Sequence, residues 1–293
     1  MPENPATTRP PSAVADLVVQ APEIGTPELK QLARLTGAAA IMALPGSATQ
    51  AFRLVQPVTR DPVAAFCAAA GFDFGFVPRD QQLDRVRLVA MDMDSTLITI
   101  ECIDELADVY GIRAQVAAIT AGAMRGELDF RESLTRRVAL LAGLDVAALQ
   151  RVYDDRLRLS PGAERMLAGF KRAGAKTLLV SGGFTFFTDR LKARLGFDHA
   201  VANLLEIVEG KLTGRISGGI VDGSVKAEEF ARLGRELAGA DGLIIAIGDG
   251  ANDLPMLARA NLSIAYHAKP LVRAKATYAI DHCGLDAVLN LLT

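Results

Sequence analysis

The chain has 293 residues, of which half are hydrophobic and 23% are charged, a composition typical of a folded protein of one or two domains. Its formal net charge of −2 leaves no field of one sign, which argues against nucleic acid or an anionic membrane as a partner. The cysteines Cys67, Cys102 and Cys283 are odd in number and widely spaced, which indicates neither a disulfide framework nor a zinc site.

The first 25 residues contain five prolines and few large apolar side chains, and a flexible N-terminal arm is predicted there. This segment lacks the basic start and apolar run of a signal peptide, and no stretch of the sequence matches the length of a membrane span. The sequence therefore predicts a cytoplasmic protein with reduced thiols and no membrane segment. It leaves open whether the chain forms a homo-oligomer.

Residues 26–83 are predicted to form a small α+β module. Helical patterns cover residues 28–35 and 61–70, and apolar strand patterns cover residues 38–44 and 72–77. A polar linker is expected from residue 78 to the start of the next region. No group of side chains with recognisable chemistry occurs in this module.

The region from residue 84 to residue 293 alternates apolar runs with helical patterns, which predicts an α/β domain with a doubly wound, Rossmann-like parallel sheet. Residues 99–158 break the alternation, because they are mostly helical and directly follow the first strand; a cap over the strand ends is expected there. Residues 204–216 are typical of a hairpin. The predicted strands are residues 86–91, 176–180, 243–247 and 262–265, and the predicted helices are residues 163–173, 187–195, 226–237 and 253–259.

Two of the predicted strands end in paired aspartates. Asp92 and Asp94 follow the first strand, and Asp249 and Asp253 follow the strand at residues 243–247. Because such sheets bind ligands at the carboxyl ends of their strands, these acids are expected to converge on one site. Carboxylates placed so close together require a cation or a proton between them, and their hard oxygen atoms suit Mg²⁺. Either run taken alone also fits an ordinary polar turn.

Two further motifs carry groups that bind phosphate. Ser181 and Gly182 follow the strand at residues 176–180, where a hydroxyl and free backbone amides can hold phosphate oxygens. Lys226 lies near the start of a predicted helix, where a cation is unfavourable to the helix dipole unless it faces an anion. A common loop and a solvated lysine are the simpler alternatives for each motif by itself.

The order of these motifs resembles the four-motif signature of the haloacid dehalogenase superfamily: Asp-x-Asp-x-Thr, then Ser, then Lys, then Gly-Asp-Gly-x-Asn-Asp. The resemblance covers residues 86–293 and points to the phosphoserine phosphatase family, through residues 92–98, Glu101, the cap segment 130–138 and residues 248–254. It implies a Mg²⁺-dependent phosphatase that hydrolyses O-phospho-L-serine, the last step of serine biosynthesis. Members with an extra N-terminal segment carry a small ACT-like regulatory module, and residues 26–83 could be a divergent version, although no motif supports this.

The resemblance also implies a role for each motif residue. Asp92 would be the nucleophile that forms an aspartyl phosphate, and Asp94 would protonate the leaving oxygen and later activate water. Mg²⁺ would be held by Asp92, the backbone carbonyl of Asp94, and Asp249. The remaining implied roles are support of the metal ligands by Asp253, binding of the phosphoryl group by Ser181, Gly182 and Lys226, and orientation of the phosphate or Lys226 by Asn252.

Substrate selection is expected in the cap. The resemblance implies that Glu101 binds the ammonium group of the substrate and that Arg137 binds its carboxylate. Helical periodicity supports Arg137 independently, because it shares a face with the apolar residues of the helix at 130–141, whereas Arg136 points away from them. A buried arginine requires a partner, and a carboxylate offers a bidentate one. Two further residues, expected in the cap core or at the pocket, are Met124 and Phe130.

Two other functions stay open on the sequence alone. The same chemistry fits a phosphotransferase, or a phosphatase for another small phosphorylated metabolite such as phosphohomoserine. A different class is an amino-acid-sensing protein in which the N-terminal module dominates. The complete set of acidic, serine and lysine motif residues argues against this second alternative.

Overall fold

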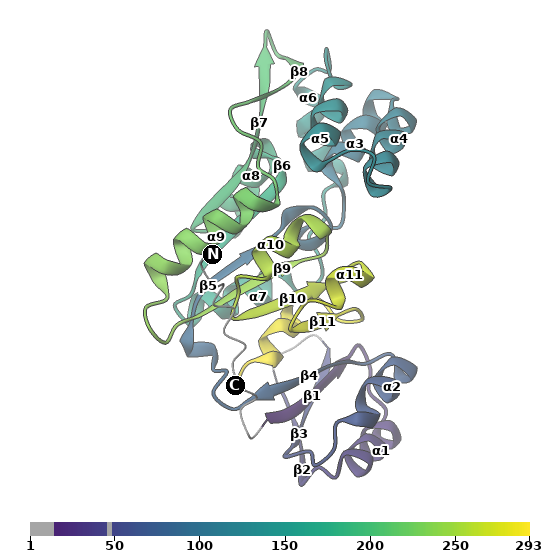
Figure 1. Cartoon of the computed structure of the whole chain (residues 1–293), viewed down its shortest axis with the longest axis vertical. Helices are drawn as coiled ribbons and strands as arrows, with labels where there is room; N and C mark the ends of the chain where they lie inside the picture. The colour runs from purple at the N-terminus through teal and green to yellow at the C-terminus, as the bar shows by residue number, and fades with distance from the viewer. Residues whose placement is uncertain (1–14, 46–48) are drawn as a thin grey trace, which may run out of the picture.

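In the computed structural model, which describes residues 15–45 and 49–293, the chain forms two sheets (Figure 1). The N-terminal sheet has four antiparallel strands in the order β2-β3-β1-β4. Its βαββαβ element order is the ferredoxin-like arrangement. The elements are β1 (Ala15–Ala21), α1 (Thr26–Thr36), β2 (Ala40–Ala43), β3 (Gln50–Val55), α2 (Asp61–Ala70) and β4 (Asp73–Pro78).

Strand β1 shows that the prediction of a flexible arm is wrong for residues 15–25. The strand lies between β3 and β4, and Leu17, Val18 and Val19 are fully buried. Consecutive apolar residues are buried because the strand is covered on both faces. Leu17 and Val19 join the cluster beneath the helices, whereas Val18 packs into the main core of the protein. The part of the predicted arm from residue 1 to residue 14 lies outside the described residues.

The second sheet has seven strands in the order β11-β10-β9-β5-β6-β7-β8. Neighbouring strands are parallel except β7 and β8, which form the predicted hairpin. Alternate strand residues contribute to two apolar clusters, one on each face, which confirms the predicted doubly wound α/β fold. The strands are β5 (Val86–Met91), β6 (Lys176–Phe184), β7 (His199–Val208), β8 (Lys211–Ser217), β9 (Leu243–Gly248), β10 (Leu262–Tyr266) and β11 (Tyr278–Ile280), and the helices are α7 (Ala163–Arg172), α8 (Thr185–Leu195), α9 (Gly223–Leu237), α10 (Leu254–Leu257) and α11 (Pro270–Arg273).

A helical cap occupies the chain between β5 and β6. The cap and the β7–β8 hairpin lie at the end of the molecule opposite the N-terminal module (Figure 1). Backbone hydrogen bonds join them, since Leu212 of the hairpin accepts from Gly143 and donates to Leu144. The hairpin therefore supports the cap from the side. The cap helices are α3 (Cys102–Tyr110), α4 (Arg113–Met124), α5 (Phe130–Ala139) and α6 (Ala147–Arg151).

The register of the central strands brings three loops to the same edge of the sheet. Met91 of β5 lies opposite Leu179 of β6 on one side and Ile247 of β9 on the other. Since these strands are parallel, the residues that follow Met91, Leu179 and Ile247 emerge side by side under the cap. The polar residues placed there are Asp92, Asp94, Ser181, Asp249 and Asp253.

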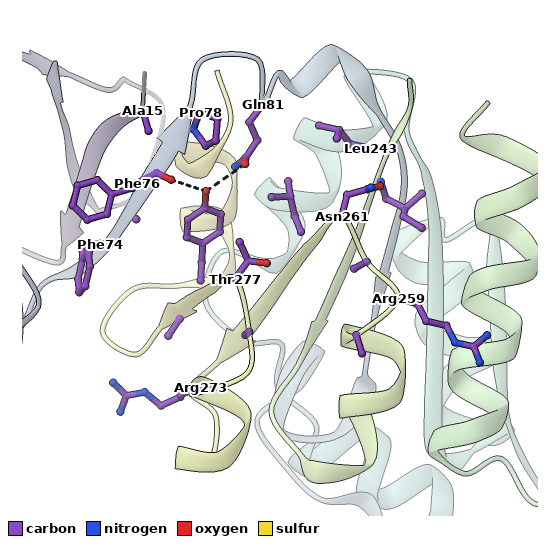
Figure 2. A pocket seen from close by; sticks show the side chains of 18 of the residues that line it. Ala15, Phe74, Phe76, Pro78, Gln81, Leu243, Arg259, Asn261, Arg273 and Thr277 are labelled. Atoms are coloured by element: carbon purple, nitrogen blue, oxygen red, sulfur yellow. Dashed lines mark hydrogen bonds between the residues drawn. The ribbon is translucent and has the colours of Figure 1, made fainter. Parts of the chain in front are cut away.

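Polar contacts attach the N-terminal module to the β11 edge of the central sheet. The buried carboxylate of Asp73 accepts hydrogen bonds from the backbone N–H groups of residues 281–283. The Tyr278 hydroxyl donates to the Phe76 carbonyl at 3.0 Å and lies 3.3 Å from Oε1 of Gln81 (Figure 2). A groove of about 1330 Å³ opens beside this contact. The groove is lined by the first residues of β9, β10 and β11. It therefore lies at the end of the sheet where these strands begin, opposite the end that carries the aspartates.

Candidate active site

Asp92 occupies the first position after β5 and is almost completely buried. Its Oδ1 accepts a hydrogen bond from the backbone N–H of Met93 at 2.7 Å, and its Oδ2 lies 2.8 Å from the Nζ of Lys226. Burial and the nearby Asp253 raise the pKa of Asp92 well above its ordinary value, while Lys226 acts in the opposite direction. The carboxylate is thus fixed in orientation and poorly solvated, as a preorganised nucleophile must be.

Asp94 lies in the tight turn Met93–Leu97 that follows Asp92. Its Oδ1 accepts from the backbone N–H of Cys102 at 2.8 Å, and its Oδ2 lies 3.4 Å from the hydroxyl of Ser181. Burial raises the pKa of Asp94 above its ordinary value, and the hydrogen bond from Cys102 offsets part of this rise. A carboxyl group with a raised pKa is suited to proton transfer, the role expected for Asp94.

Three acidic side chains form a cluster at the strand ends. One carboxylate oxygen from each of Asp92, Asp249 and Asp253 lies within 4.8 Å of the others. Burial and Asp253 raise the pKa of Asp249 to about 6, and the hydroxyl of Thr96 donates to its Oδ1 at 2.8 Å. Lys226 contacts two of these carboxylates and supplies one positive charge. Three ionised carboxylates would therefore leave the cluster with a net negative charge. A divalent cation with hard-oxygen preference fits this donor set.

Asp253 differs from the other two acids because it binds the backbone of its own loop as well as Lys226. Its Oδ1 lies 2.8 Å from the Nζ of Lys226, and its Oδ2 accepts from the backbone N–H groups of Asp249 and Gly250. This side chain therefore holds the Gly248–Asp253 loop and Lys226 in place. Such an arrangement suits the supporting role expected for Asp253.

Lys226 is fully buried in the first turn of α9 and contacts both Asp92 and Asp253. Asp222 caps this helix by accepting from the backbone N–H groups of Ser224 and Val225. Burial alone would lower the pKa of Lys226, but the two carboxylates outweigh it, and the pKa is raised above its ordinary value. The lysine therefore remains charged, and the alternative of a solvated surface lysine is excluded.

The loop that contains Ser181 and Gly182 is packed tightly between the acids and the cap. The backbone N–H of Gly183 donates to the Ser181 hydroxyl at 2.8 Å. A Cβ atom at Gly183 would lie 2.5 Å from Oδ2 of Asp94, and one at Gly182 would lie 2.7 Å from the ring of Phe130. Both glycines are thus needed for close approach, and Phe130 of α5 covers the loop. Met124, by contrast, is 72% exposed and does not belong to the cap core.

Glu101 and Arg137 bring opposite charges to the underside of the cap. The Ser95 hydroxyl donates to Oε1 of Glu101 at 2.7 Å, and burial and Asp94 raise the pKa of Glu101 to about 7. Burial lowers the pKa of Arg137, and the negative charges of Asp104, Glu101 and Asp94 oppose this. Among the described residues, no ion pair joins Arg137 to Glu101. Arg136 lies on the exposed face and pairs with Glu132 at 2.6 Å, as the helical periodicity predicts.

Asn252, which was expected to orient the phosphate or Lys226, is half-buried in the Gly248–Asp253 loop. Its Oδ1 folds back over Gly250, and its carbonyl lies next to Gly223 at the start of α9. Within the described part of the chain its side chain makes no hydrogen bond. Sequence reasoning assigned no role to Ser95 or Thr96, although Thr96 is part of the Asp-x-Asp-x-Thr motif, and it gave no signal for Asn203, which contacts Gly182 from β7.

Comparisons with known proteins identify the family of the chain. Residues 89–258 match the haloacid dehalogenase-like hydrolase family, and residues 17–63 match a family described as a domain of unknown function. A phosphoserine phosphatase of Polaromonas sp. is 53% identical over 218 residues, which are 73% of this chain and 92% of that protein. No helix of the described residues has the length and apolarity required to cross a membrane.

Solved structures give the same picture. An unliganded probable phosphoserine phosphatase from Vibrio cholerae has a TM-score of 0.80 at 35% identity, covering 95% of this chain and 86% of that one. A substrate-bound phosphoserine phosphatase has a TM-score of 0.65 at 35% identity, covering 71% of this chain and 99% of that one. The chain therefore belongs to the haloacid dehalogenase-like hydrolases, within the phosphoserine phosphatase family.

Proposed function

We propose that the chain hydrolyses O-phospho-L-serine to L-serine and phosphate through an aspartyl phosphate on Asp92, with Mg²⁺ as the cofactor. The observation that carries this proposal is the contact of one buried lysine with both Asp92 and Asp253, beside Ser181 and Asp94 at one edge of the sheet. The relatives described above are named phosphoserine phosphatases, which supports phosphoserine as the substrate.

In the first step a carboxylate oxygen of Asp92 attacks phosphorus, and the bond from phosphorus to the seryl oxygen breaks. Asp94 supplies the proton that the departing oxygen needs, and its raised pKa favours the protonated form required here. In the second step the Asp94 carboxylate takes a proton from water as the water attacks phosphorus. Phosphate leaves, Asp92 is regenerated, and Asp94 again carries its proton.

Positive and hydrogen-bonding groups offset the charge on the transferring phosphoryl oxygens. Lys226 is already in contact with Asp92, and the Ser181 hydroxyl lies 3.4 Å from Oδ2 of Asp94, with Gly182 next in the chain. Charge stabilisation by preorganised groups supplies most of the catalysis in phosphoryl transfer. The burial of these groups strengthens each interaction, because water is excluded.

The acidic cluster fits a bound Mg²⁺ by the number and type of its oxygens. Asp92, the carbonyl of Asp94, and Asp249 would hold the ion, and Asp253 would support them through its contacts with the loop and with Lys226. When bound, the ion neutralises negative charge on the nucleophile and the phosphoryl group. It would also relieve the repulsion that raises the pKa of Asp249.

Recognition of the serine moiety is assigned to the cap. Glu101 would bind the α-ammonium group and Arg137 the α-carboxylate, because these two opposite charges face the acids without pairing with each other. Phe130, which covers Gly182, would close the pocket over the phosphoryl group. The α-ammonium and α-carboxylate groups of the serine moiety would then each face a side chain of opposite charge.

The proposal is tested by measuring phosphate release from a panel of small phosphomonoesters, with Mg²⁺ and with a chelator. Phosphoserine is expected to be the fastest substrate, and activity is expected to disappear with the chelator and return with added Mg²⁺. Equal rates across the panel, or full activity without a divalent ion, would contradict the proposal. Formation of phosphohomoserine from added homoserine would instead identify a phosphotransferase.

Inhibition by the product L-serine is expected to weaken as the pH falls below about 7. The pKa of Glu101 is about 7, so the side chain becomes neutral below that pH and loses its attraction for the ammonium group. The inhibition constant should rise by about tenfold per pH unit between pH 6.5 and 5.5 and level off above pH 7.5. In Glu101→Gln the dependence should vanish. A Gln variant that keeps the wild-type profile would assign the titration to another group.

A further inference from the structure

We propose that Asn203 of β7 is a positioning residue that fixes the two phosphoryl-binding elements relative to each other. These elements are the Ser181–Gly183 loop and the start of α9, which carries Lys226. The inference rests on the proposed function, since it concerns the same phosphoryl site. Asn203 belongs to none of the four sequence motifs.

The contacts of Asn203 bridge the two elements. Its side chain is 1% exposed. The amide Nδ2 donates to the carbonyl of Gly182 at 2.8 Å, and Oδ1 accepts from the backbone N–H of Val221 at 2.8 Å. One buried side chain therefore binds the Gly182 carbonyl and the Val221 N–H, which directly precedes the N-cap residue of α9. An asparagine amide is suited to this, because it presents both a donor and an acceptor at fixed separation.

The position of Asn203 in the sheet explains why the loop needs such a side chain. Strands β6 and β7 pair regularly up to Val180 and Val201, and pairing resumes only at Phe184 and Asn203. Three residues of β6 thus bulge out of the ladder against one residue of β7, which presents residues 181–183 to the site. The bulge removes the Gly182 carbonyl from the ladder, and the Asn203 amide replaces the missing donor.

The peptide between Gly182 and Gly183 is held at both ends as a result. Asn203 binds its carbonyl, and the Ser181 hydroxyl accepts from its N–H. Two consecutive glycines have large conformational freedom, and a loop built from them is not rigid by itself. Asn203 supplies the restraint that aims the loop toward the phosphoryl group.

The second contact extends the restraint to Lys226. Val221 directly precedes Asp222, whose carboxylate caps α9. Lys226 follows in the first turn of that helix and reaches Asp92. Asp222 also pairs with Arg131 of α5, so the start of α9 is connected to the cap as well. A displacement of Asn203 would therefore alter the spacing of Lys226 and the Gly182 loop, which must bind the same phosphoryl oxygens.

The test compares Asn203→Asp and Asn203→Ala with wild type, using the full chain loaded with Mg²⁺. Asp keeps the acceptor and loses the donor, and Ala removes both without adding a charge. The readouts are kcat and KM for phosphoserine, and the inhibition constants of inorganic phosphate and L-serine. We expect phosphate to bind roughly 10- to 100-fold more weakly and kcat to fall by a similar factor. Inhibition by L-serine, which depends on the cap, should change by less than about twofold.

Asn290→Asp is the matched control, because Asn290 is a buried asparagine that donates to Gln20 of β1, in the N-terminal module. It should lower the melting temperature without changing the phosphate inhibition constant. Wild-type phosphate inhibition and kcat in both Asn203 variants would overturn the inference, and so would equal weakening of phosphate and L-serine. Failure of the wild-type chain to hydrolyse phosphoserine would count against the proposed function instead; phosphate binding, measured calorimetrically, would still decide the role of Asn203.

Discussion

Replacing Asp92 with Asn is expected to lower kcat for phosphoserine by roughly 10⁴-fold or more. In the proposed mechanism the carboxylate of Asp92 forms the covalent bond to phosphorus, and a neutral amide cannot replace it. Covalently bound phosphate, detected in rapidly quenched reactions by mass spectrometry, should be present in the wild-type protein and missing in the variant. The change is nearly isosteric, so the Met93 N–H keeps an acceptor.

Asp73→Asn is a suitable control for the loss of a buried carboxylate. Asp73 accepts three backbone N–H groups at the junction with the N-terminal module, beside β11, which two strands (β10 and β9) separate from β5. Its replacement should lower thermal stability and leave kcat close to that of wild type. A wild-type level of covalent phosphate in Asp92→Asn would show that another residue is the nucleophile.

The acidic site is predictable from sequence because parallel sheets have a simple rule. Apolar runs that end in Asp92 and Asp249 indicate strands, and the carboxyl ends of parallel strands share one edge. No long-range pairing has to be known for this, beyond the fact that the strands belong to one sheet. Arg137 is predictable for a similar reason, since helical periodicity alone separates it from Arg136.

The parts that sequence could not provide depend on contacts between distant segments. Strand β1 is recognisable only through its pairing with β3 and β4, and the prolines before it suggested a loose arm. Asn203 has a role only because β6 bulges away from β7 at Val180, and no local pattern marks such a bulge. Met124 is exposed although its helix packs in the cap, because a helix end places its last side chain beyond the neighbouring helices.

Arg137→Ala is expected to lower kcat/KM for phosphoserine by roughly 10²-fold or more, because the substrate carboxylate would lose a charged partner in a half-buried site. Phosphoethanolamine carries the same ammonium and phosphate groups but no carboxylate. For this substrate the variant and the wild type should have similar kcat/KM values. The comparison isolates the carboxylate contact, since any general damage to the cap would slow both substrates.

Arg136→Ala controls for the loss of an arginine from the same helix. Arg136 is exposed and pairs with Glu132, and exposed pairs of this kind contribute little to stability. Its replacement should leave kcat/KM for both substrates within about twofold of wild type. If Arg137→Ala slows phosphoserine and phosphoethanolamine equally, Arg137 holds the cap together and does not select the substrate. If only phosphoserine is slowed, the face of α5 that periodicity assigns to the interior is the face that recognises the amino acid.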